Sequence, residues 1–133
     1  MSRIVVDASA LVEYLLGTEA AAAMAASITR RDVDLHIPAL CDIEVASALR
    51  RALIRGFLSE ARAHEALQDF LALPLLRHGH QALLPRCFGL KHVLSAYDAT
   101  YVALAEHLEA PLLTGDRPLA RAARRLGLRC LPE

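Results

Sequence analysis

Residues 4–7 read Ile-Val-Val-Asp, a short β-branched run that ends at an acidic residue. A run of this kind predicts a buried strand, with Asp7 directly after it. A second stretch has the same form, since residues 111–114 read Pro-Leu-Leu-Thr and predict a strand, after which Gly115 and Asp116 lead into a helix. Parallel strands present ligand sites at their carboxyl ends, so we expect Asp7 and Asp116 at one edge of a common sheet.

The rest of the chain alternates between short apolar strands and helical segments. Further strands are expected at residues 35–37, 73–77 and 128–131. Helices are expected at residues 9–16, 19–31, 39–55, 59–71, 95–109 and 116–123, and residues 79–94 predict a helix interrupted near Pro85 and Gly89. Helical crossovers between short strands imply an α/β fold with a parallel sheet covered on both faces. No repeat, linker or low-complexity tract divides the chain, so we expect a single domain over residues 1–133.

The composition is that of a globular domain, with 55% hydrophobic and 23% charged residues. The 133 residues carry 15 basic and 15 acidic side chains, and the formal net charge is zero. This balance excludes a polybasic, histone-like nucleic-acid binder, although it leaves room for a local basic patch.

The cysteines and the apolar segments indicate a cytoplasmic protein. Cys41, Cys87 and Cys130 are odd in number, widely spaced and form no C-x-x-C pair, which is typical of buried thiols in a reducing compartment. The apolar start at residues 4–16 contains two acids and does not fit a signal peptide. The Ala-rich stretch 20–28 is too short to span a bilayer, so no membrane association is expected.

Two further acids fall near the edge where Asp7 and Asp116 are expected. Glu44 lies in the first turns of the helix that follows Pro38, and Asp98 opens the helix before the strand at 111–114. Taken singly, each aspartate also fits a helix cap, and Glu44 also fits a surface position. Four acids from four segments that meet at one edge indicate a site.

Clustered carboxylates are tolerated only where protons or cations offset their charge. Two such charges repel by about 4 kcal/mol at 4 Å and an effective dielectric near 20. Carboxylates without His or Cys ligands suit a hard cation such as Mg²⁺ or Mn²⁺, which grips substrate phosphates. A cation of this kind can activate water for in-line attack on phosphorus, so the sequence predicts phosphodiester cleavage.

Four stretches of the chain resemble the PIN domain, and specifically the toxin subunit of VapBC-type toxin–antitoxin pairs. They are Val-Val-Asp-Ala-Ser-Ala-Leu at 5–11, Glu-Val-Ala-Ser-Ala-Leu at 44–49, Tyr-Asp-Ala-Thr-Tyr-Val-Ala-Leu-Ala at 97–105 and Leu-Leu-Thr-Gly-Asp-Arg-Pro-Leu at 112–119. They occur in order, at fitting separations, and span nearly the whole chain.

The resemblance implies a three-layer fold, with a five-stranded parallel sheet between helices. It implies that the family's acids, here Asp7, Glu44, Asp98 and Asp116, bind Mg²⁺ or Mn²⁺ and cleave single-stranded or looped RNA. Thr114 matches a hydroxyl that supports the site, and Ser9, which falls in the first motif, is a candidate substrate-binding residue. The resemblance also implies a homodimer and a cognate antitoxin protein whose C-terminal segment lies over the acids.

Arginine clusters flank two of the acids and are candidates to hold RNA phosphates. One contains Arg117, Arg121, Arg124 and Arg125, and the other contains Arg50, Arg51 and Arg55. The alternative is a solvated helix face. Arg117 is the best candidate because it adjoins Asp116. The pair His78 and His80 has no nearby acid or cysteine, which favours an exposed loop over a metal site.

Two other classes of protein begin with a strand followed by an acid. A phosphatase of the haloacid dehalogenase type expects a second Asp two residues after the first, where this chain has Ser9. A phosphate-receiver signalling module expects adjacent acids after the first strand and a Lys after the last, and both are missing. A PIN domain that only binds would lack one or more of the four acids, and all four are present.

Overall fold

The computed structural model describes residues 2–133 and contains a five-stranded sheet whose neighbouring strands all run parallel. The strands lie in the order β3-β2-β1-β4-β5. Their bounds are Ser2–Val6 for β1, Val33–Pro38 for β2, Leu75–His78 for β3, Leu112–Leu113 for β4 and Cys130–Leu131 for β5. The expected α/β fold with five parallel strands is confirmed, and β1 lies at the centre of the sheet.

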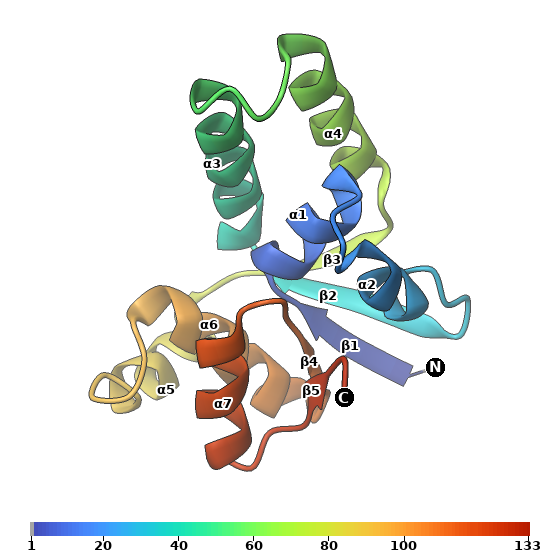
Figure 1. The fold of residues 1–133 in the computed structure, drawn as a ribbon. Coiled ribbons are helices and arrows are strands. Elements are labelled where there is room, and N and C mark those ends of the chain that lie inside the picture. Colours follow the sequence, from blue (N-terminus) through green and yellow to red (C-terminus); the bar gives the residue numbers. More distant parts are fainter. Residues whose placement is uncertain (1) are drawn as a thin grey trace.

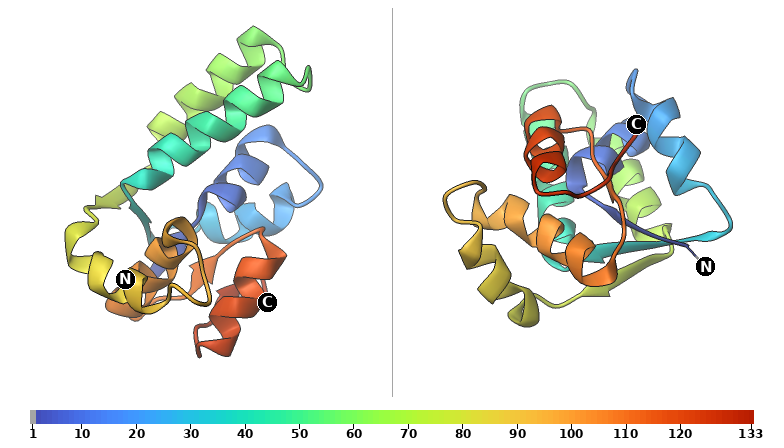
Figure 2. Two further views of the ribbon diagram at one scale, coloured as in Figure 1. Left: turned by 90° about the vertical axis from the view of Figure 1, so that its left-hand side faces the viewer. Right: turned by 90° about the horizontal axis from the view of Figure 1, so that it is seen from below.

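Helices cover both faces of this sheet. The bounds are Ala8–Leu16 for α1, Ala21–Ile28 for α2, Leu40–Ile54 for α3, Glu60–Ala72 for α4, Gln81–Leu83 for the 3₁₀ turn η1, Leu84–Gly89 for α5, Ala96–Leu108 for α6 and Arg117–Arg125 for α7. In Figure 1, α1 and α2 lie above the sheet, and α6 lies below it against β1, β2 and β4. Figure 2 shows α3 and α4 side by side, extending beyond the sheet.

The predicted and observed elements differ mainly at their ends. The helix expected over 19–31 is confined to Ala21–Ile28, and no side chain caps its N-terminus. The interruptions expected near Pro85 and Gly89 are confirmed, because a separate helix, α5, begins at Leu84 with Pro85 in its first turn and ends at Gly89. A proline fits there because the first turn of a helix makes no use of its missing N–H.

The core lies at the centre of the sheet, which explains the uninterrupted apolar runs in the sequence. Val5, Val6, Leu112 and Leu113 are fully buried, because β1 and β4 have neighbours on both sides and helices above and below. Each such side chain contributes about 1.5–3 kcal/mol of hydrophobic free energy. The three cysteines are free and buried, as predicted.

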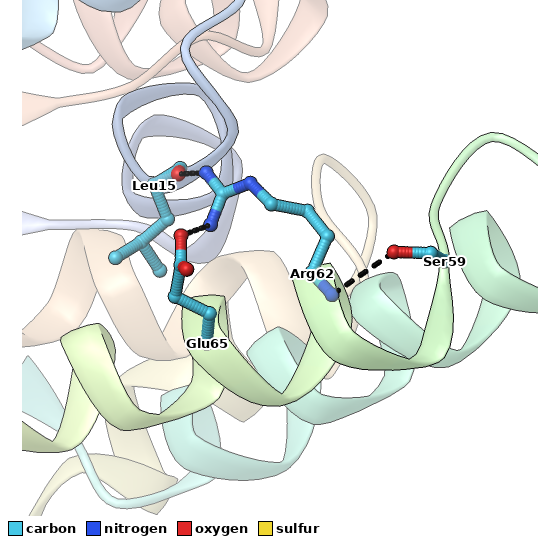
Figure 3. A network of polar contacts seen from close by, with 4 residues as sticks. All are labelled: Leu15, Ser59, Arg62 and Glu65. Atoms are coloured by element: carbon cyan, nitrogen blue, oxygen red, sulfur yellow. Dashed lines mark hydrogen bonds and ion pairs between the residues drawn. The ribbon is translucent and has the colours of Figure 1, made fainter.

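Arg62 joins α4 to the C-terminal end of α1 (Figure 3). Its guanidinium donates to the carbonyl oxygen of Leu15 at 2.5 Å and to the carboxylate of Glu65 at 2.9 Å. The backbone N–H of Arg62 donates to the hydroxyl of Ser59, the N-cap of α4, at 3.1 Å. The last carbonyls of a helix lack partners within the helix and carry partial negative charge, so a cation stabilises them. The contact anchors the helix that begins beside Asp7.

Within residues 2–133, no single helix is both long and apolar enough to cross a membrane. The two apolar helices α1 and α2 reach the required length only together, and a bend of 110° separates them.

Candidate active site

The parallel pairing of β1 and β4 places the first and last acidic motifs side by side. Val6 is in register with Leu113, so the chain leaves both strands at the same edge. The backbone N–H of Asp7 donates to the carbonyl oxygen of Leu113 at 3.0 Å, which sets Asp7 beside Thr114. Residues 107 positions apart in the sequence therefore meet because the strands are parallel neighbours.

Three donors hold the carboxylate of Asp7. Oδ1 accepts from the hydroxyl of Ser9 at 2.7 Å and from the backbone N–H of Ala10 at 3.0 Å. Oδ2 accepts from the hydroxyl of Thr114 at 2.6 Å, and that hydroxyl accepts in turn from the backbone N–H of Asp116 at 2.9 Å. The hydroxyl side chains of the first and last motifs thus fix one acid.

Glu44 and Tyr101 form a second polar contact at the same edge. The phenolic hydroxyl of Tyr101, on α6, donates to Oε1 of Glu44, on α3, at 2.6 Å. The ring of Tyr101 is buried, with only 2% of its surface exposed. Burial raises the pKa of Tyr101 far above its ordinary value, and burial raises the pKa of the neighbouring Cys41 thiol to about 12. Both groups therefore stay protonated.

All four predicted acids line one pocket of about 370 Å³, as do Ser9, Glu13, Arg51 and Tyr101. Sequence analysis did not single out Glu13, although it lies one helical turn after Ser9 on α1. Arg117 lines an adjacent pocket instead, which shares Glu13 and Asp116 with the acidic one.

The acids of the pocket are electrostatically coupled. Burial raises the pKa of Asp7 from 3.8 to about 6, and repulsion from Asp116 adds to this rise, while its three hydrogen bonds oppose it. Burial also raises the pKa of Asp98, and repulsion from Asp116 and from Glu44 adds to it. Negative charge in this pocket is therefore unfavourable unless a cation offsets it.

The donor set of the pocket fits a hydrated hard cation. All four predicted ligands are carboxylates, which Mg²⁺ and Mn²⁺ prefer. Among residues 2–133, no three His, Cys, Asp or Glu side chains already form a group that could hold a metal ion. Mg²⁺ usually keeps several waters and takes only one or two carboxylates directly, so a lined pocket suits it without a closed cage of ligands.

The prediction of an exposed loop is wrong for His78, which belongs to β3, whereas His80 does lie in a loop but is only partly exposed. His78 ends β3 beside β2, where its Nε2 shares a hydrogen bond with Nδ1 of buried His36 at 2.8 Å. Nε2 of His80 accepts from the backbone N–H of Leu40 at 2.9 Å. Burial lowers the pKa of His36 and of His78. The sequence around His78 and His80 gave no sign of these hydrogen bonds to other segments of the chain.

The chain matches the family model of the PIN domain over residues 4–125. It is 42% identical over 134 residues to ribonuclease VapC1 of Mycobacterium tuberculosis, covering 98% of this chain and 96% of that protein. The chain therefore belongs to the PIN domain family, as its motifs indicated.

Solved structures share the fold. The crystal structure of PAE2754 from Pyrobaculum aerophilum has a TM-score of 0.71 and 26% identity, covering 98% of this chain and 84% of that one. VapBC2 from Rickettsia felis, solved bound to a DNA fragment from its promoter, has a TM-score of 0.70 with 12% identity and covers 96% of each chain. At that identity the likeness to VapBC2 concerns the fold alone.

Proposed function

We propose that this protein is a Mg²⁺- or Mn²⁺-dependent endoribonuclease that acts as the toxin of a VapBC-type pair. The observation that carries the proposal is the convergence of Asp7, Glu44, Asp98 and Asp116 on one pocket. Those acids stand at the motif positions of a family to which the chain belongs, and VapC1, its relative at 42% identity, is named a ribonuclease.

The four carboxylates would hold a hydrated cation, one or two of them directly and the others through its waters. When bound, the cation would polarise the phosphate and lower the pKa of a coordinated water. The carboxylate of Asp7 is held in one orientation by Ser9, the N–H of Ala10 and Thr114. It therefore loses little conformational freedom when the cation binds.

Arg51 is the arginine that we assign to the RNA phosphate at this pocket. It follows Glu44 by seven residues on α3, which is two helical turns, and it lines the acidic pocket. Arg50 lines a groove between α3 and α4 instead. Arg117, in the adjacent pocket, suits a neighbouring phosphate of the same strand.

Two protein partners belong to the proposal. An antitoxin would cover the acidic pocket, since the toxin role requires a reversible block of the site. A homodimer is supported by large apolar side chains left exposed, namely Leu84 and Phe88 on α5, Val93 in the segment between α5 and α6, and Tyr97 at the start of α6. The buried free cysteines suit a reducing cytoplasm.

The test is cleavage of a structured RNA by purified protein in Mn²⁺ or Mg²⁺, with and without chelator. We expect metal-dependent cuts with 5′ phosphate ends, lost by about 100-fold or more in Asp98→Asn, which removes a proposed ligand. Asp69→Asn, an exposed acid on α4, is the matched control and should cut like the wild type. Wild-type cleavage by Asp98→Asn would contradict the assignment, and acylphosphate formation at Asp7 would favour a phosphatase.

A further inference from the structure

Glu44 differs from the other acids of the pocket in the way it is held. Asp7 and Asp116 follow strands, and each caps the helix that it precedes, at 3.0 Å and 3.1 Å. Glu44 stands inside α3, on a long side chain that would otherwise rotate freely. Within residues 2–133, the hydroxyl of Tyr101 is the one donor that the structure gives to its carboxylate.

The hydroxyl of Tyr101 serves no packing purpose of its own. Its ring is buried, and a phenylalanine ring would fill the same space. A buried hydroxyl lowers stability unless it is hydrogen-bonded, and here the bond is short because its acceptor is a carboxylate. The bond engages Oε1 and leaves Oε2 of Glu44 without a protein partner in the described part of the chain.

Tyr101 also links two of the acids mechanically. It follows Asp98 by three residues on α6, so the two side chains lie on the same face of that helix. One turn of α6 therefore carries both Asp98 and the hydroxyl that holds Glu44, which comes from α3.

We propose that Tyr101 is a positioning residue, which fixes the separation of Glu44 from Asp98 so that both can serve one divalent cation. This inference rests on the proposed metal-dependent function. Mutation of a residue that hydrogen-bonds to a metal ligand, without binding the metal itself, typically changes metal affinity by about 10- to 100-fold. In this role Tyr101 acts through Glu44 and is not itself a ligand of the cation.

The direct test is Mn²⁺ binding by isothermal titration calorimetry, without RNA. We expect Tyr101→Phe to weaken binding by about 10- to 100-fold. The control Tyr14→Phe removes a hydroxyl from a half-buried tyrosine on α1 outside the acidic pocket, and it should bind like the wild type. Unchanged or tighter binding by Tyr101→Phe would overturn the inference while leaving the proposed function standing. A wild type that neither binds Mn²⁺ nor cuts RNA would remove both.

A double-mutant cycle separates positioning from a general structural effect. In the Glu44→Ala background, Tyr101→Phe should cause no further loss of Mn²⁺ affinity, because the group it acts through is gone. A further loss of about tenfold in that background would show that Tyr101 acts by another route, and would refute the inference.

A second measurement uses the wild-type protein and does not depend on the variant folding. The Tyr101 hydroxyl proton is buried and hydrogen-bonded, so it should exchange slowly enough to be observed by NMR. Its resonance should shift when diamagnetic Mg²⁺ is added, since its acceptor becomes a ligand. A resonance that stays in place at saturating Mg²⁺ would contradict the inference.

Discussion

Asp7→Asn should make the metal-free protein more stable at neutral pH, although it removes a proposed metal ligand. In the folded protein the pKa of Asp7 is about 6, above the ordinary value of 3.8 that it takes when unfolded. The folded state therefore binds more protons between these two values. The contribution of Asp7 to the unfolding free energy is therefore fully present below about pH 4, and it is lost as the pH rises through about 6.

The pKa difference of Asp7 sets the size of the effect. It corresponds to about 3 kcal/mol of unfolding free energy lost by the wild type at pH 7. An asparagine amide would donate to Thr114, whose hydroxyl can then turn toward the Ser9 oxygen at 3.3 Å. This rearrangement retains the network at a small cost, so we expect a gain of about 1–3 kcal/mol.

The assay is urea denaturation of both proteins from pH 4 to 8 in chelator, repeated with saturating Mn²⁺. The difference in unfolding free energy should be small at pH 4, grow through pH 6 and level off above it. Mn²⁺ should stabilise the wild type far more than Asp7→Asn, because only the wild type keeps the full ligand set. The surface control Asp69→Asn should stay within about 0.5 kcal/mol of the wild type at every pH. Two curves that run parallel from pH 4 to 8 in chelator would refute the reasoning.

Two further outcomes follow from the arginines. Arg51→Ala should raise KM for RNA several-fold with little change in kcat. It should also lower the slope of log affinity against log salt by about 0.7. Arg50→Ala should change neither KM nor this slope. Equal effects of the two variants in a cleavage and filter-binding series would remove Arg51 from the site. Arg62→Met should lower the unfolding free energy by about 1 kcal/mol in urea denaturation, because the carbonyl of Leu15 loses its donor, while Glu65→Ala should change it by under about 0.5 kcal/mol. A larger loss in Glu65→Ala would show that the surface ion pair is the stronger contact.

The sequence predicted the sheet and the convergence of the acids because both follow from local signals. A β-branched run before Asp7 and an apolar run before Thr114 predict strands, and helical crossovers make such strands parallel. Parallel strands share a carboxyl edge, so the meeting of Asp7 and Asp116 required no knowledge of tertiary contacts. The strand ends were less accurate, since β5 begins at Cys130 and not at Leu128.

The sequence could not predict contacts made by the tips of side chains. Helical spacing places Tyr101 on a buried face but does not say that its hydroxyl reaches Glu44. Spacing likewise could not separate Arg51 from Arg50, because a rotation of α3 by 100° decides which one faces the acids. The contact between His36 and His78 depends on the register of β2 and β3, which the sequence leaves open.

The capping and site interpretations are compatible at Asp7 and Asp116, whereas α6 is capped by Ser95 and not by Asp98. At the first two acids the combination explains how the fold holds clustered carboxylates. Asp7 and Asp116 do cap α1 and α7, using Oδ1 in both cases. The partial positive charge at each helix N-terminus favours the ionised carboxylate. At Asp7, however, burial outweighs this and the hydrogen bonds, since the pKa still rises to about 6. Capping therefore orients the acids without neutralising them, and the remaining unfavourable charge is what a bound divalent cation would remove.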